Sequence, residues 1–287
     1  MVDGQDPVRL GPAVLDQYAA FSRFNSPYPA HDAGCAIDLY PTEGAPSPVS
    51  GEVVLTRRTR APDRPYAADH EHLVVVDTGE HLARLLHVEP SVEPGDEVAV
   101  GDSLGSLVRS GYFAPWVDNH LHLGFRPRDA DPVRASGSLP VVADVTVQAV
   151  PWNGRGVVVE REPTYVVLGA PSHPAPGDGF AGIAADGASG QAAVGVLDGG
   201  LPHYDGGGLG NGMDGEATGP VSFASVLVGS AEEGLVTWDD VEVWANGTAA
   251  TGLSLACHRD RLGAKLVSWD GVPAAVGEEV RVEVRRP

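Results

Sequence analysis

Short apolar runs rich in Val and Leu alternate with turn-forming residues along most of the chain. Turn sequences such as Glu93-Pro94-Gly95-Asp96 separate the runs, so the pattern favours short β-strands. In the first half we expect strands at 49–55, 73–76, 82–88, 98–100, 121–125 and 141–150. In the second half we expect them at 157–160, 165–168, 192–197, 221–228, 235–244, 253–257, 265–269 and 279–284.

Helical periodicity is almost absent. The best candidate is a short helix at 14–24, whose apolar positions fit one face loosely. We therefore predict a mostly β chain with a β domain at 1–150 and a β-sandwich-like domain at 151–287. The glycine-rich stretch 198–208 is expected to be a loop, either flexible or ligand-binding.

The composition narrows the possible partners. There are 39 Asp and Glu against 19 Lys and Arg, which gives a formal net charge of −20. Such a surface repels phosphate groups, so we expect neither nucleic acid nor anionic lipid as a partner. Lys265 is the only lysine, and this acidic, lysine-poor composition is typical of halophilic proteins or of GC-rich coding. The sequence does not specify an oligomeric state.

Two further features concern the compartment. No stretch is long and apolar enough to cross a bilayer, and the first residues lack the basic and apolar regions of a signal peptide. Two cysteines, Cys35 and Cys257, do not make a disulfide framework. We therefore expect a cytoplasmic protein that does not insert into membranes.

Most of the histidines lie in one segment, which is the candidate for catalysis or metal binding. Six of the ten lie between His70 and His122, and His31 precedes them. In a strand, His120 and His122 would project from the same face, with Leu121 on the other. Two imidazoles at this spacing can bind one Zn²⁺, or one can bind while its neighbour acts as a base. Solvent-exposed strand histidines are the alternative. His70, His72 and His81 stand beside acidic or turn residues, and we expect them to be solvated.

Asp38 is the second notable position. It stands inside the apolar run 35–40, where burial of a carboxylate is costly unless the group is paired or bound to a metal. The alternative is an aspartate at a strand end that faces water. A third feature, the paired turns within 88–107, is typical of barrel-sandwich hybrid folds.

Together, these features resemble the lysostaphin and LytM-type zinc endopeptidases over residues 25–127. Five features occur here in that family's order. They are the Asp-containing run, the segment Gly44-Ala45-Pro46-Ser47-Pro48-Val49-Ser50-Gly51-Glu52-Val53-Val54, a strand ending in His87, the Pro94-Gly95-Asp96 turn and His120-Leu121-His122. The resemblance implies a duplicated-hybrid-motif β fold and a peptide-like substrate. It also implies that His31, Asp38 and His122 bind Zn²⁺ and that His87 and His120 assist catalysis.

The spacing before Asp38 departs from the family pattern. The family places its first His four residues before its Asp, where this chain has Gly34; His31 lies seven residues before, with the opposite strand parity. His31 reaches the metal only if a bulge or turn forms at Gly34. Cys35 is a possible soft ligand, or a small buried residue.

Three functions remain open at this point. The first is a zinc-dependent hydrolase that cleaves a peptide or amide bond through a metal-activated water. The second is a catalytically inactive binding or scaffold module of the same fold. The third is a phosphocarrier like the glucose-specific carrier of sugar transport, which shares the fold and uses paired histidines.

Overall fold

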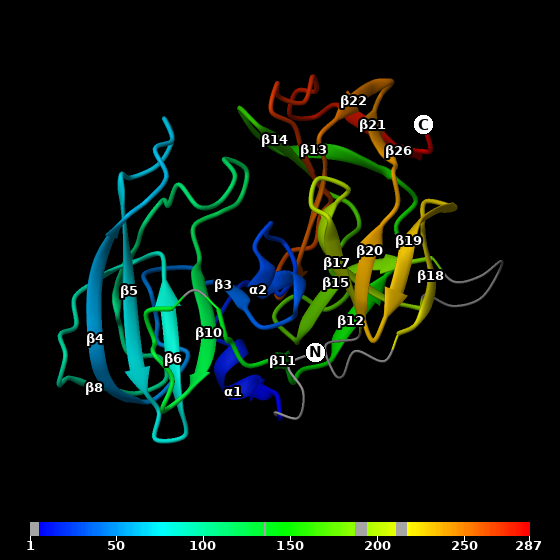
Figure 1. The fold of residues 1–287 in the computed structure, drawn as a ribbon. Coiled ribbons are helices and arrows are strands. Elements are labelled where there is room, and N and C mark those ends of the chain that lie inside the picture. Colours follow the sequence, from blue (N-terminus) through cyan, green and yellow to red (C-terminus); the bar gives the residue numbers. More distant parts are fainter. Residues whose placement is uncertain (1–5, 135, 187–193, 211–216) are drawn as a thin grey trace. The chain divides into compact units, whose positions relative to one another are not determined.

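The computed structural model describes residues 6–134, 136–186, 194–210 and 217–287, and Figure 1 shows their path. The chain divides into two compact units by its internal contacts. Unit 1 comprises residues 1–21 and 29–144, and unit 2 comprises residues 22–28 and 145–287. The short segment 22–28 thus joins the second unit, although it precedes most of the first in sequence.

Unit 1 is built around one antiparallel sheet. Its strands β8 (Glu97–Val98), β4 (Gly51–Arg60), β5 (His70–Asp77), β6 (His81–Leu86), β10 (Leu121–Pro127) and β3 (Ile37–Tyr40) follow one another in that order across the sheet. Two smaller pairs accompany it, antiparallel β7 (Val88–Pro90) with β9 (Gly105–Leu107) and parallel β1 (Val8–Leu10) with β11 (Val141–Ala143).

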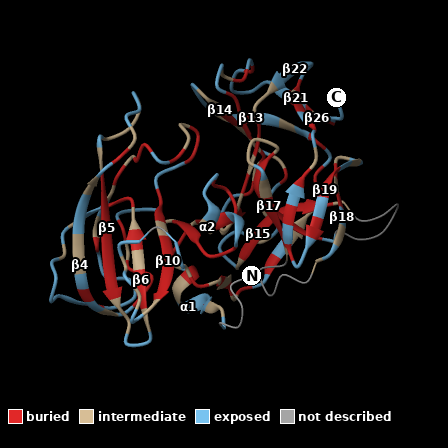
Figure 2. Cartoon of the chain, viewed as in Figure 1, coloured by how far each residue is buried: buried red, intermediate tan, exposed pale blue. Residues whose placement is uncertain are grey.

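Burial explains why these runs are strands. In β5 the central residues are almost completely buried, as the red colouring in Figure 2 shows. Leu73 and Val75 pack against Leu82 of β6, while Val74 and Val76 are equally inaccessible. Strands buried on both faces are apolar at every position rather than at alternate positions, as here.

Unit 2 is also made of strands. Within its described residues the strands named below pair antiparallel, except that β12 (Val147–Val150) pairs in parallel with β15 (Phe180–Ala185). Its strands are β12 Val147–Val150, β13 Arg155–Glu162, β14 Tyr165–Leu168, β15 Phe180–Ala185, β16 Gly195–Leu201, β17 Gly206–Gly210, β18 Gly219–Phe223, β19 Val226–Glu232, β20 Leu235–Trp238, β21 Glu242–Ala245, β22 Thr248–Ala250, β23 Gly252–Leu255, β24 Cys257–His258, β25 Lys265–Val267 and β26 Glu279–Arg285.

Two series of hydrogen-bonded neighbours share β16. One series is β15–β16–β17–β20–β19–β18. The other runs from β16 through β23, β25, β14, β13, β26 and β21 to β22.

The mostly β fold class is confirmed, and the predicted strands recur with shifted ends. The runs 82–88, 141–150, 221–228, 235–244 and 253–257 are each divided between two strands, and the start of the run 192–197 lies outside the described residues. Strands β1, β2, β3, β9, β15, β17 and β22 lie outside the predicted runs. Among the described residues, neither helix has the length and apolar character needed to span a membrane.

The predicted helix at 14–24 is wrong for most of its length. Helix α1 spans only Pro12–Leu15, and the chain then forms strand β2, Ala20–Ser22. All three residues of β2 are buried, so this segment has no polar face for a surface helix. A second short helix, α2, spans Pro29–Asp32.

The prediction of a loop at 198–208 is also wrong, because most of this stretch lies in β16 and β17. Glycine is required there by close packing. A Cβ atom on Gly207 would lie 2.2 Å from the Trp238 ring, and one on Gly208 would lie 2.2 Å from the Phe24 ring. The glycines thus let two aromatic rings lie directly on the strand backbone.

Candidate metal centre

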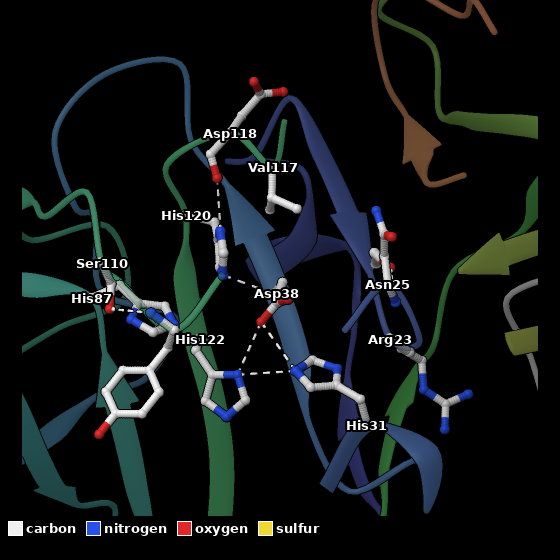
Figure 3. A network of polar contacts seen from close by, with 12 residues as sticks. Arg23, Asn25, His31, Asp38, His87, Ser110, Val117, Asp118, His120 and His122 are labelled. Atoms are coloured by element: carbon white, nitrogen blue, oxygen red, sulfur yellow. Dashed lines mark hydrogen bonds and ion pairs between the residues drawn. The ribbon is translucent and has the colours of Figure 1, made fainter. Parts of the chain in front are cut away.

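Asp38 and His122 face each other across two paired strands. The register of β3 and β10 places Asp38 directly opposite His122. Residues opposite each other in an antiparallel pair have neighbouring side chains on the same face. His122 Nδ1 accordingly lies 3.0 Å from Asp38 Oδ1 (Figure 3).

His31 reaches this pair from helix α2. The helix ends at Asp32, and Gly34, two residues later, has a φ of +66°, which lies in the left-handed region. The backbone N–H of Gly34 donates to the His31 carbonyl oxygen, and that of Cys35 donates to the Ala30 carbonyl oxygen. The predicted turn at Gly34 is therefore confirmed. Strand parity places no restriction on His31, because this residue lies in a helical turn before the strand.

The three donor atoms form a compact triangle. His31 Nε2 lies 3.3 Å from Asp38 Oδ1 and 3.1 Å from His122 Nδ1, which completes the 3.0 Å edge between Asp38 and His122. Bonds of about 2.0–2.1 Å to a tetrahedral Zn²⁺ would give edges of roughly 3.3–3.4 Å. Nitrogen and carboxylate donors are typical zinc ligands, so the donor set fits this metal in type and spacing.

Burial strengthens the electrostatic coupling inside the triangle. Burial opposes ionisation of Asp38, but His31, His120 and His122 surround the carboxylate, and its pKa lies well below its usual value. Burial lowers the pKa of His122 to about 4, against the opposing effect of Asp38. The cluster therefore combines a carboxylate with an imidazole that stays neutral at pH 7, the protonation states that metal binding needs.

His120 is positioned beside the triangle by a backbone contact. Its Nδ1–H donates to the Asp118 carbonyl oxygen at 2.8 Å, which leaves the lone pair of the neutral ring on Nε2. Nε2 lies 3.5 Å from Asp38 Oδ2. Burial lowers the pKa of His120 to about 4. His120 and His122 thus project to the same side of β10, as the His-x-His spacing predicts.

His87 lies within ring-contact distance of the cluster. Its ring centroid is 4.9 Å from that of His120 and 5.9 Å from that of His122. Phe113 packs against both His87 and His120, with centroids 5.1 Å and 4.7 Å away. The structure therefore brings together all five histidine and aspartate residues that the sequence singled out.

Glu71 is a site residue that the sequence analysis missed. Its Oε2 lies 2.5 Å from His87 Nδ1, and its Oε1 accepts the backbone N–H of His87 at 2.8 Å. Burial opposes its ionisation, but His87 and Ser110 lower the pKa of Glu71 to about 2. An acidic residue in the run that forms β5 is visible in the sequence, but its contact with His87 is not.

The other histidines of unit 1 and Cys35 lie outside the donor triangle. His72 was expected to be solvated, but only 6% of its surface is exposed, because β5 is buried on both faces. His70 and His81 are partly buried. Cys35 is buried and its Sγ donates to the Ala33 carbonyl oxygen at 3.4 Å, and it is not part of the donor triangle.

Fold and site together define an all-β protein whose N-terminal unit contains a buried cluster of histidine and aspartate donors. Residues 9–143 match the family model described as the N-terminal domain of the domain of unknown function DUF8155, and residues 148–285 match the model of its C-terminal domain. The chain carries both domains of this family in order and belongs to it. No curated protein matches the chain.

One solved structure with a detectable likeness is the catalytic domain of the antimicrobial peptidase lysostaphin from Staphylococcus simulans, crystallized in the absence of phosphate. The identity is 20% and the TM-score is 0.29, over 43% of this chain and 90% of the other. A likeness this weak does not establish an activity. Membership of the lysostaphin and LytM-type peptidases therefore stays a prediction.

Proposed function

We propose that unit 1 is a zinc-dependent hydrolase that cleaves a peptide or amide bond. The observation that supports this most strongly is the buried triangle of His31 Nε2, Asp38 Oδ1 and His122 Nδ1, with edges of 3.0 to 3.3 Å. These three atoms would hold the metal. Bound Zn²⁺ would supply Lewis-acid chemistry, by acidifying a water molecule and polarising a carbonyl group.

His120 is the residue we assign to proton transfer. Its Nδ1–H donates to the Asp118 carbonyl oxygen, so the lone pair on Nε2 faces Asp38 and the donor triangle. A group placed there can accept a proton from a nucleophile and return it to the leaving amine. The buried position keeps this ring neutral at pH 7 and therefore able to accept a proton.

His87 is the second residue we assign to catalysis. Glu71 engages its Nδ1, which leaves Nε2 as the nitrogen available to a substrate. An N–H at that position would stabilise negative charge on the carbonyl oxygen, and a lone pair would orient the attacking water. Phe113 packs against both rings and limits their rotation.

The first test of the proposal measures metal content. Protein dialysed against metal-free buffer is analysed by mass spectrometry for bound zinc, alongside Asp38→Asn and His122→Ala. The control is His81→Ala, which changes a histidine of the same unit that lies outside the donor triangle. We expect the wild type and the control to hold the same amount of zinc, and each of the two site variants to hold one equivalent less. Metal-free wild-type protein that does not take up added Zn²⁺ would refute the proposal.

The second test measures hydrolysis. Peptide mixtures are incubated with the zinc-loaded protein, and the products are identified by mass spectrometry. We expect His120→Ala to retain zinc and to lose cleavage by about 100-fold or more, the usual contribution of a general acid–base group. Zinc binding without any cleavage would instead support an inactive binding module of the same fold.

A further inference from the structure

A second group of possible metal ligands lies elsewhere on unit 1. His70 and His72 of β5 and Glu89 of β7 place their donor atoms within 4.8 Å of one another. His70 Nε2 lies 3.1 Å from Glu89 Oε2, and His72 Nδ1 lies 3.6 Å from the same oxygen. The two imidazole rings meet edge to face, with centroids 5.5 Å apart.

The hydrogen atoms available to His70 do not account for its contacts if the ring is neutral. Its Nδ1 lies 3.0 Å from Asp69 Oδ1, so both ring nitrogens face carboxylate oxygens. Carboxylates only accept hydrogen bonds, and a neutral imidazole has one N–H. A cation between His70 Nε2 and Glu89 Oε2 would account for both contacts of a neutral ring, with its single N–H on the Asp69 side.

His72 supports the same position for a cation. Its side chain is 8% exposed, and its Nδ1 is buried with no hydrogen-bond partner within the described part of the chain. A buried polar atom without a partner is unfavourable, and a nearby cation would provide one. One cation shared by His70, His72 and Glu89 would satisfy all three donors.

We propose that His70, His72 and Glu89 form a second metal site, specific for a divalent transition-metal ion such as Zn²⁺. Two imidazoles and one carboxylate are a frequent ligand set for such ions and leave coordination positions open. Asp69 acts as the outer partner that receives the His70 Nδ1–H and fixes the direction of Nε2. Because the Glu89 side chain is 52% exposed, this site exchanges metal with solvent more readily than the buried triangle.

The second site is separate from the first, and its assignment does not depend on the proposed hydrolase function. Successive strand residues point to opposite faces of a sheet. Glu71 projects from β5 toward His87, whereas His70 and His72, on either side of it, project toward Glu89. One face of β5 therefore carries the two histidines of the second site, and the other face carries Glu71, which contacts His87.

Zinc stoichiometry tests this proposal. The metal-free protein is titrated with Zn²⁺ alone in a calorimeter, and bound zinc is counted independently by mass spectrometry. We expect two equivalents for the wild type, one for Glu89→Gln, one for Asp38→Asn and none for the double variant. Glu80→Gln, which removes an exposed carboxylate of the same unit, should still bind two equivalents.

The zinc stoichiometries of Glu89→Gln and Asp38→Asn test the two sites separately. Glu89→Gln changes one atom of an exposed side chain, so the protein should fold normally, and circular dichroism checks this. An unchanged stoichiometry in Glu89→Gln would overturn the second site. Loss of one equivalent in Glu89→Gln with no effect of Asp38→Asn would support the second site while refuting the ligand set of the first.

Discussion

Both carboxylate oxygens of Glu71 contact His87, one at the backbone N–H and the other at the ring Nδ1. His87 has a φ of +69°, a left-handed conformation that is uncommon for residues other than glycine. The buried carboxylate therefore holds both the strained backbone and the ring direction of His87. Such strain is found where the surrounding structure fixes a functional side chain.

Replacement of Glu71 by Gln tests this arrangement. An amide keeps the size but offers one acceptor oxygen instead of two, so one N–H of His87 loses its partner. We expect a loss of about 1–3 kcal/mol in the free energy of unfolding and a roughly 10- to 100-fold fall in kcat/KM. The pH profile of kcat/KM should shift, while the zinc bound at the triangle stays unchanged. Wild-type kinetics in the variant would show that Glu71 does not position His87.

Acid should destabilise unit 1 in a defined pH range. In the folded protein, burial lowers the pKa values of His120 and His122 from the ordinary 6.5 to about 4. The unfolded chain therefore binds more protons between pH 6.5 and 4, and stability falls as the pH falls through this range. Each histidine contributes on the order of 3 kcal/mol at most, and this stability is fully present above pH 6.5.

Urea unfolding of the metal-free protein at a series of pH values measures this effect. The metal-free form is used because protons and metal compete for the same nitrogens. The variant His120→Gln removes one of the two titrating groups, so its stability should depend less steeply on pH between 6.5 and 4. An equally steep dependence in this variant would contradict the assignment of the effect to His120.

Part of the site could be predicted from local patterns, whereas the roles of His31 and His87 followed only from the family resemblance. His120 and His122 are two residues apart, and Asp38 interrupts an apolar run; both signals are visible without a fold. The role of Glu71 could not be derived in this way, because its partner His87 is 16 residues away in the chain. The second cluster was missed for the same reason, since Glu89 meets His70 and His72 only after β5 and β7 come together.

The errors in the fold prediction arose where packing overrides composition. Ala20 to Ser22 fit a helical pattern loosely, but they form a strand that is buried throughout. The glycine-rich stretch was read as a loop because glycine is frequent in loops. Its glycines instead provide the space that the rings of Phe24 and Trp238 occupy.

Gly208→Ala should therefore destabilise unit 2. The added methyl group would lie 2.2 Å from the Phe24 ring, which must move or the strand must shift. Overpacking of this kind costs about 1–3 kcal/mol, measurable as a lower midpoint in urea unfolding. Gly11→Ala is the control, because its Cβ would meet nothing within 4 Å. The double variant Gly208→Ala, Phe24→Leu should recover part of the loss; no recovery would show that the Phe24 ring is not the obstacle.

Removal of the metal should weaken unit 1 and leave unit 2 unchanged. A ligand that binds only the folded state stabilises it by about 2.7 kcal/mol when its concentration is 100 times its Kd. The donor triangle belongs entirely to unit 1, so chelation should lower the melting temperature of that unit alone. Calorimetry before and after chelation measures the shift. Tryptophan fluorescence reports on Trp116 in unit 1 and on the four tryptophans of unit 2, which are Trp152, Trp238, Trp244 and Trp269. In Asp38→Asn with Glu89→Gln, chelation should have no effect. A shift confined to unit 2 would contradict both metal sites.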